Sequence, residues 1–221
     1  LNSMGARIEG AGTRRITIEG VPELHGTEHT VIPDRIEAGT FLAAGAIAGG
    51  SITLRKVNPE HLQSTTNALR DAGCKLDIQR DQISLSSDGH ALPVDLITEP
   101  YPGYPTDMQA QMCAVLCIGS GTSTIKETVF PQRFMHISEL KRMGADITLE
   151  GASVSISGVD RLSAAPVMAS DLRASAALVL AGLVAEGTTE VHRVYHIDRG
   201  YESIDEKLNA LGASIERVKE H

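Results

Sequence analysis

Three aspartates occupy similar places along the chain. Asp34, Asp107 and Asp171 each precede a run of small and apolar residues of helical length. A short carboxylate before a helix accepts hydrogen bonds from the first backbone N–H groups, so capping is one prediction. For Asp34 and Asp171 a functional role weighs equally, because the adjacent Arg35 and Arg173 are expected to pair with them at the same helix ends.

Asp107 lies in a different context, the proline-braced turn YPGYPTDMQAQ. Here Thr106 is expected to cap the helix, which leaves the Asp107 carboxylate to act as a hydrogen-bond acceptor or general base. Asp107 is therefore the candidate for proton transfer.

Two arginines follow the second and third aspartates at similar distances. Arg133, in VFPQRFMHI, comes 26 residues after Asp107, and Arg199, in YHIDRGYE, comes 28 residues after Asp171. A single arginine is most simply a solvated surface charge. Two in corresponding turns favour recognition of phosphate or carboxylate through the bidentate guanidinium fork.

These residues belong to an internal repeat. Each copy runs from its aspartate to the glycine that ends a second helix, over 39, 37 and 41 residues (34–73, 107–144 and 171–212). Each unit is predicted to be strand, helix, strand, helix, strand, strand, with alternating stretches such as KLDIQRDQISLS and ADITLEGASVSIS as the closing strands.

The first helix of each repeat is small or apolar nearly all round: AGTFLAAGAIAGG, MQAQMCAVLCIG and RASAALVLAGLVA. A helix without a polar face must be buried. If the three run parallel, their N-terminal ends converge on one face, where helix dipoles and free N–H groups favour an anion. The second helices are amphipathic and are expected at the surface.

The sequence predicts three stretches of different character. Residues 1–20 match the end of a preceding repeat, and residues 21–30 are rich in turn formers, as expected of an interdomain crossover. Residues 31–221 form the main domain.

Composition excludes several classes of function. A formal net charge of −8 and the absence of Trp argue against a nucleic-acid partner, and no apolar stretch is long enough for a membrane span or signal, which favours the cytoplasm. Cys74, Cys113 and Cys117 lack metal-ligand or disulfide spacing, and no phosphate loop is present, so neither metal nor cofactor is expected.

The segments YPTDMQAQ, ETVFPQRFMHISELKRMGA, MASDLRASAALVLAGL and YHIDRGYESIDEKLNALGA closely resemble the C-terminal half of the UDP-N-acetylglucosamine 1-carboxyvinyltransferases, in the enolpyruvyl transferase family. The resemblance covers essentially the whole chain. It implies an α/β (α+β) fold, an inside-out α/β barrel of three βαβαββ repeats with buried parallel helices. The 5-enolpyruvylshikimate-3-phosphate synthases share the architecture but are less similar at TDMQAQ and RFMH.

The resemblance also implies an activity in peptidoglycan synthesis. Phosphoenolpyruvate would donate its enolpyruvyl group to the 3-hydroxyl of UDP-N-acetylglucosamine through a tetrahedral intermediate. The implied catalytic residues are Asp107 as general base, Asp171 and Arg199. The implied contacts to the substrates come from Val129 (to the nucleotide sugar), Arg133, Arg173 and Arg199 (to phosphoenolpyruvate), Asp34 and Arg35.

The chain also departs from the family pattern. It lacks the N-terminal Lys-Asn segment and the mobile loop that carries the proton donor, and none of its three cysteines lies in that loop's glycine-rich context. We therefore expect a C-terminal fragment that is inactive without an N-terminal partner domain. The alternatives are a non-catalytic binding or dimerisation module and a shikimate-pathway synthase domain.

Overall fold

The computed structural model describes residues 1–218 and divides into two compact units, Leu1–Ile32 and Pro33–His221. The first unit consists of a 3-10 turn, η1 (Asn2–Met4), and an antiparallel hairpin of β1 (Arg7–Glu9) and β2 (Thr17–Glu19). Its residues are almost all exposed, so the hairpin has no core of its own.

Three helices form the interior of the second unit: α1 (Arg35–Ala48), α3 (Gln109–Cys117) and α5 (Leu172–Gly182). As their composition predicts, they are buried almost completely, and α3 packs against both α1 and α5. Small residues permit close approach: a Cβ on Gly45 of α1 would lie 2.5 Å from Cγ2 of Ile52 in the neighbouring strand.

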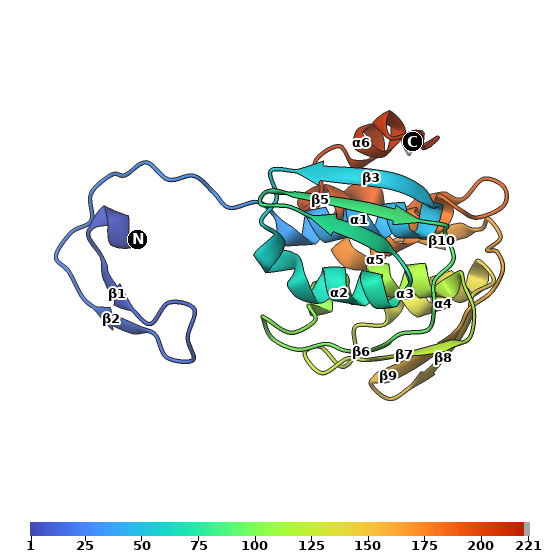
Figure 1. Cartoon of the computed structure of the whole chain (residues 1–221), viewed down its shortest axis with the longest axis horizontal. Coiled ribbons are helices and arrows are strands. Elements are labelled where there is room, and N and C mark those ends of the chain that lie inside the picture. The colour runs from blue at the N-terminus through green and yellow to red at the C-terminus, as the bar shows by residue number, and fades with distance from the viewer. Residues whose placement is uncertain (219–221) are drawn as a thin grey trace. The chain divides into compact units, whose positions relative to one another are not determined.

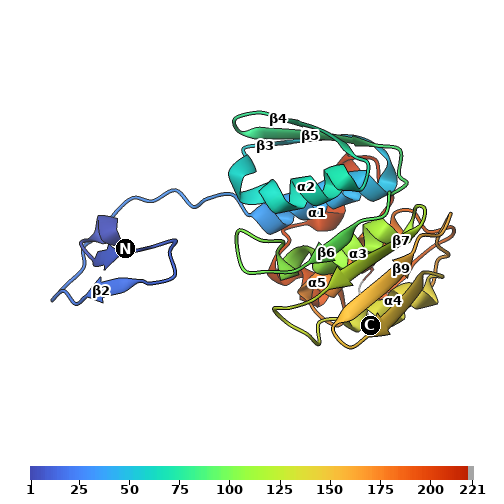
Figure 2. The same ribbon diagram turned by 60° about the horizontal axis from the view of Figure 1, so that its bottom comes forward.

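Two sheets lie on opposite sides of these helices (Figures 1 and 2). One has the order β3 (Gly50–Arg55), β5 (Gln82–Ser87), β4 (Lys75–Ile78), all antiparallel. The other has the order β6 (Asp95–Ile97), β7 (Thr122–Lys126), β9 (Ser153–Ser157), β8 (Asp146–Glu150), in which β6 and β7 are parallel. A third pair, β10 (Pro166–Met168) and β11 (Glu190–His192), is also parallel.

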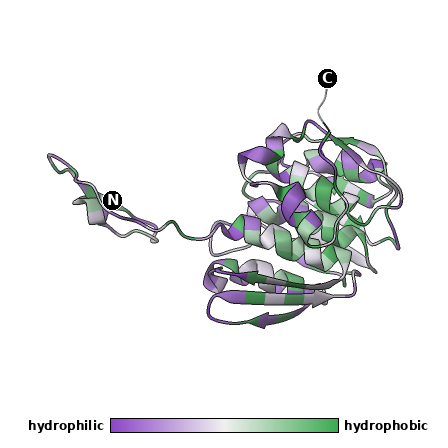
Figure 3. Ribbon diagram, turned by 90° about the horizontal axis from the view of Figure 1, so that it is seen from above, coloured by the Kyte–Doolittle hydropathy of each residue, from purple (hydrophilic) through white to green (hydrophobic). Residues whose placement is uncertain are grey.

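The remaining helices are amphipathic and half-exposed, as the sequence predicts. They are α2 (Gln63–Asp71), α4 (Met135–Arg142) and α6 (Ile204–Ala210), with short 3-10 segments η2 (Pro59–Leu62), η3 (Thr106–Met108) and η4 (Val194–Arg199). Hydrophobic and hydrophilic residues alternate along the strands at the lower edge of Figure 3, as a sheet with one buried face requires. No helix in the described part of the chain is long and apolar enough to cross a membrane.

Within residues 1–218, the predicted repeat unit is complete only once. The second repeat contains β6, α3, β7, α4, β8 and β9, the predicted order of elements. The first has no strand directly before α1, where the chain is VPELHGTEHTVIP, and the third has no strand in residues 213–218. Local alternation is not sufficient for a strand, because a strand also needs a neighbour with which to pair.

Candidate functional site

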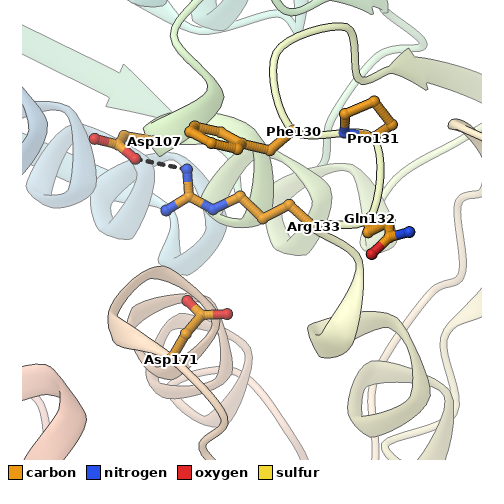
Figure 4. A pocket seen from close by; sticks show the side chains of 6 residues that line it. All are labelled: Asp107, Phe130, Pro131, Gln132, Arg133 and Asp171. Atoms are coloured by element: carbon orange, nitrogen blue, oxygen red, sulfur yellow. Dashed lines mark hydrogen bonds and ion pairs between the residues drawn. The ribbon is translucent and has the colours of Figure 1, made fainter.

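A surface cleft of about 740 Å³ opens at the N-terminal ends of α3 and α5. Figure 4 shows the residues that line it, which are Asp107, Phe130, Pro131, Gln132, Arg133 and Asp171. Three of the charged residues that the sequence singles out, Asp107, Arg133 and Asp171, therefore line the same cleft.

Asp107 is bound by two arginines from different parts of the chain. Its Oδ1 accepts a hydrogen bond from Arg133 over 2.6 Å, and its Oδ2 one from Arg173 over 3.4 Å. Partial burial raises the pKa of Asp107, but the hydrogen bonds and charges of the two guanidinium groups outweigh it and hold this pKa below its usual value. The two arginines therefore favour the ionised carboxylate of Asp107.

Asp34 and Asp171 cap their helices. Asp34 accepts hydrogen bonds from the amides of Ile36 and Glu37, and Asp171 from those of Arg173 and Ala174. Asp107 has no such role, since it lies inside η3 and α3 begins two residues later.

The expected pairing of Asp171 with its neighbour Arg173 is wrong. The Asp171 carboxylate is turned to the backbone amides of α5, so the Arg173 guanidinium extends to Asp107 instead. The Arg35 guanidinium lies 5.6 Å from the ring centre of Tyr101. Tyr101 belongs to the loop between β6 and η3. Arg35 does not line the cleft.

The expected capping role of Thr106 is also wrong. No side chain caps α3, whose N-cap residue is Met108. The Thr106 hydroxyl donates to Oε2 of Glu127 over 2.9 Å and accepts from Arg133 over 3.3 Å. The hydroxyl therefore bonds to residues that are distant in the chain, and such partners cannot be predicted from the neighbouring sequence.

Glu127 is a site residue that the sequence analysis missed. Its side chain is buried, and its Oε1 accepts hydrogen bonds from the amides of Val129 and Phe130 over 2.8 and 2.9 Å. The available signal was an acidic residue directly after a strand of alternating character, in KETVF.

Arg173 is also held from the interior. Its guanidinium donates to the hydroxyl of Tyr201 over 3.2 Å and lies 5.6 Å from the centre of that ring. The same hydroxyl is 2.9 Å from Oγ1 of Thr40 and accepts from Gln111 over 3.3 Å. These contacts connect α1, α3 and α5 with the cleft.

Arg199 lies apart from this cluster. It ends η4, is exposed, and is not among the residues that line the cleft. Both arginines precede the second helix of their repeat, but Arg199 lies inside η4 and α6 begins only at Ile204, whereas α4 begins at Met135, directly after the turn that carries Arg133.

The charged residues in the lining of the cleft are Arg133, Asp107 and Asp171. Two guanidinium groups share a single carboxylate, and Phe130 stacks beside Arg133, with its ring centre 5.6 Å from the guanidinium. Arginine forks bind phosphate and carboxylate groups well, and a nearby carboxylate can accept a proton from a hydroxyl.

Known proteins resemble the chain along almost its whole length. A protein named UDP-N-acetylglucosamine 1-carboxyvinyltransferase from Akkermansia muciniphila is 60% identical over 220 residues, which are 99% of this chain and 52% of the relative. One of the same name from Methylacidiphilum infernorum is 59% identical over 218 residues, again 99% and 52%. The chain thus spans about half the length of the curated relatives it matches.

Solved structures agree. The enolpyruvyl transferase NikO from Streptomyces tendae matches 96% of this chain and 51% of its own, with a TM-score of 0.85 and 28% identity. EPSP synthase from Acinetobacter baumannii, at 20% identity and a TM-score of 0.67 over 86% and 45% of the two chains, shares the fold. A family model described as EPSP synthase (3-phosphoshikimate 1-carboxyvinyltransferase) matches residues 1–208. The chain therefore belongs to this family of enolpyruvyl transferases.

Proposed function

We propose that the chain is the C-terminal, anion-binding half of a UDP-N-acetylglucosamine 1-carboxyvinyltransferase. The observation that carries the proposal is the placement of Asp107 between Arg133 and Arg173 in an open cleft. The names of relatives 56–60% identical to the chain support this acceptor substrate.

The proposed architecture is an inside-out barrel of three βαβαββ repeats, with α1, α3 and α5 as its parallel inner helices. In this division, residues 1–20 end a preceding repeat, 21–30 form the crossover and 31–221 form the substrate-binding domain. The burial of the three helices between sheets supports it.

In the proposed reaction the 3-hydroxyl oxygen of the sugar bonds to C2 of phosphoenolpyruvate while its proton passes to Asp107. A proton donor outside this chain protonates C3, and phosphate later leaves as C3 gives up a proton. Arg133 and Arg173 would stabilise the negative charge that moves onto the phosphate. When the substrate anion binds beside these arginines, its negative charge raises the pKa of Asp107 and makes this residue a stronger base.

The other residues have supporting roles in this proposal. Asp34 and Asp171 fix the starts of α1 and α5, with the Asp171 carboxylate at the cleft wall. The Val129 carbonyl would contact the nucleotide sugar. Arg35 and Arg199 would contact the substrates only when a second domain closes on the cleft.

The partners would be UDP-N-acetylglucosamine, phosphoenolpyruvate and a domain corresponding to the other half of the relatives, with the cytoplasm and cell-wall synthesis as the setting. The 221 residues alone are expected to be inactive.

A complementation assay tests this function. Phosphate release from phosphoenolpyruvate is measured with UDP-N-acetylglucosamine for this chain alone and mixed with the N-terminal half of the Akkermansia muciniphila relative. We expect activity only in the mixture, and a loss on the order of 100-fold or more with Asp107→Asn. Turnover with shikimate 3-phosphate instead would favour the synthase alternative. Inactivity of associated halves with either acceptor would favour a binding module.

A further inference from the structure

Glu127 is a buried carboxylate at the end of the sheet where two parallel strands finish. It follows β7 directly, and Thr98 follows the parallel neighbour β6, so the two residues come together at the carboxyl ends of adjacent strands. The Glu127 residue is 1% exposed. Burying an ionised carboxylate is costly unless hydrogen bonds compensate it.

The compensation comes from four donors. Three of them meet at Oε1: the Thr98 hydroxyl at 2.6 Å and the amides of Val129 and Phe130 at 2.8 and 2.9 Å. The fourth, the Thr106 hydroxyl, bonds to Oε2 at 2.9 Å. One carboxylate thus joins the loop that leads to Arg133 with the turn that carries Asp107.

The bond at Oε2 begins a chain of hydrogen bonds, here called the relay, that runs from Glu127 through Thr106 and Arg133 to Asp107. A threonine hydroxyl has one proton, and Thr106 donates it to Glu127. The Thr106 oxygen is then available as an acceptor, and Arg133 Nη1 donates to it over 3.3 Å while also donating to Asp107 over 2.6 Å. The guanidinium is therefore held from two sides.

We propose that Glu127 is a positioning residue, which acts through Thr106 to hold the Arg133 guanidinium against Asp107. It does not touch the cleft, because it is not among the residues that line it. The inference rests on the proposed function only in that Arg133 there binds the substrate anion.

Three variants separate this relay from simple support of the loop. In Glu127→Gln the retained oxygen can still accept the Val129 and Phe130 amides, but the new NH₂ group donates toward Thr106, whose proton must turn away. Thr106→Val removes the relay and leaves the amide contacts of Glu127 intact. Thr106→Ser retains the hydroxyl and is expected to behave as the parent chain.

The readouts are the pKa of the Asp107 carboxyl, measured by ¹³C NMR, and the affinity for inorganic phosphate as the probe anion. We expect Glu127→Gln and Thr106→Val to raise the pKa of Asp107 toward its ordinary value of 3.8 and to weaken phosphate binding by about 10-fold. Glu186→Gln, which removes an equal charge at an exposed ion pair with Arg161, serves as the control and should change neither.

A parental Asp107 pKa in folded Thr106→Val protein would overturn the proposal, whatever Glu127→Gln does to stability. If Glu127→Gln fails to fold, Glu127→Asp takes its place, because the shorter carboxylate keeps the charge but withdraws from Thr106, and a parental pKa of Asp107 in this variant would also overturn the proposal. This test can fail or succeed independently of the proposed function. If the variants raise the pKa of Asp107 but the complemented enzyme is inactive, the positioning role of Glu127 stands and the proposed function fails. If the complemented enzyme is active but the pKa of Asp107 does not change in the variants, the function stands and the positioning role fails.

Discussion

The hydroxyl of Tyr201 accepts a 3.2 Å hydrogen bond from the guanidinium of Arg173, and this contact ties the charged cleft to the interior of the fold. The Tyr201 side chain is 1% exposed, and its hydroxyl also meets Thr40 of α1 and Gln111 of α3. Polar groups from all three inner helices thus converge on one phenolic oxygen.

Tyr201→Phe is expected to lower the free energy of unfolding by about 1 to 2 kcal/mol, because buried hydrogen-bonding groups lose a partner. Urea unfolding measures the change. The matched control is Tyr195→Phe, which removes a hydroxyl from an exposed side chain that contacts Arg193. An equal loss in both variants would show that the buried network adds no stability.

The ion pairs of Asp107 predict a pH dependence. Because Arg133 and Arg173 hold its pKa below the ordinary value of 3.8, their stabilising effect is present above that pH and is lost as the pH falls through the lower, folded-state pKa. The stability advantage of the parent chain over Asp107→Asn should therefore shrink below about pH 4. Unfolding at a series of pH values tests this, and Asp160→Asn, at an exposed residue, should show no such convergence.

His136 is expected to make folding sensitive to mild acid. Burial lowers its pKa to about 4, although the charge of Asp171 acts in the opposite direction and that of Arg133 lowers it further. Since the unfolded chain takes up this proton near pH 6.5, the stabilising effect is complete above that pH and is lost toward pH 4.

Protonation of His136 is expected to lower the free energy of unfolding by about 2 kcal/mol as the pH falls from 7 to 4.5. Urea unfolding of His136→Leu should show a correspondingly weaker pH dependence. The exposed His90, changed to Gln, provides the comparison. A parental slope in His136→Leu would mean that the buried imidazole takes up a proton without cost.

Two glycines of the inner helices should respond oppositely to alanine. At Gly45 a Cβ would lie 2.5 Å from Ile52, so we expect Gly45→Ala to destabilise the fold by about 1 to 3 kcal/mol. At Gly182 the nearest neighbour is 3.4 Å away, and Gly182→Ala should be neutral or stabilising by up to about 1 kcal/mol. Thermal unfolding distinguishes the two, and similar effects would contradict the close approach of α1 to β3.

The inner helices could be predicted from the sequence because their burial is recorded in composition. Residues that are small or apolar on every side of a helix leave no face for water. The sequence analysis also set Asp107 apart from the two capping aspartates, and Asp107 indeed caps no helix, although the expected reason, capping by Thr106, was wrong. The residues that hold the site were not, since Glu127 depends on Thr98 and Thr106, 29 and 21 residues away in the chain.

The same limit explains the errors. Thr106 was expected to cap a helix and Arg173 to pair with Asp171, both from adjacency in sequence. In the structure, contacts across 21 and 66 residues replace the local ones. Tyr201 gave no sequence signal at all, because its partner Thr40 lies 161 residues away.

The three aspartates occupy equivalent positions in the repeats but have different structural roles. In the first and third repeats the helix begins directly after the aspartate, and the carboxylate caps it. In the second repeat, the 3-10 turn η3 precedes α3, and the Asp107 carboxylate caps no helix. In the proposed function, the role of Asp107 therefore depends on where α3 begins, since the residue type is the same in all three repeats. A search for similar sites in repeat proteins should therefore compare helix starts as well as residue identities.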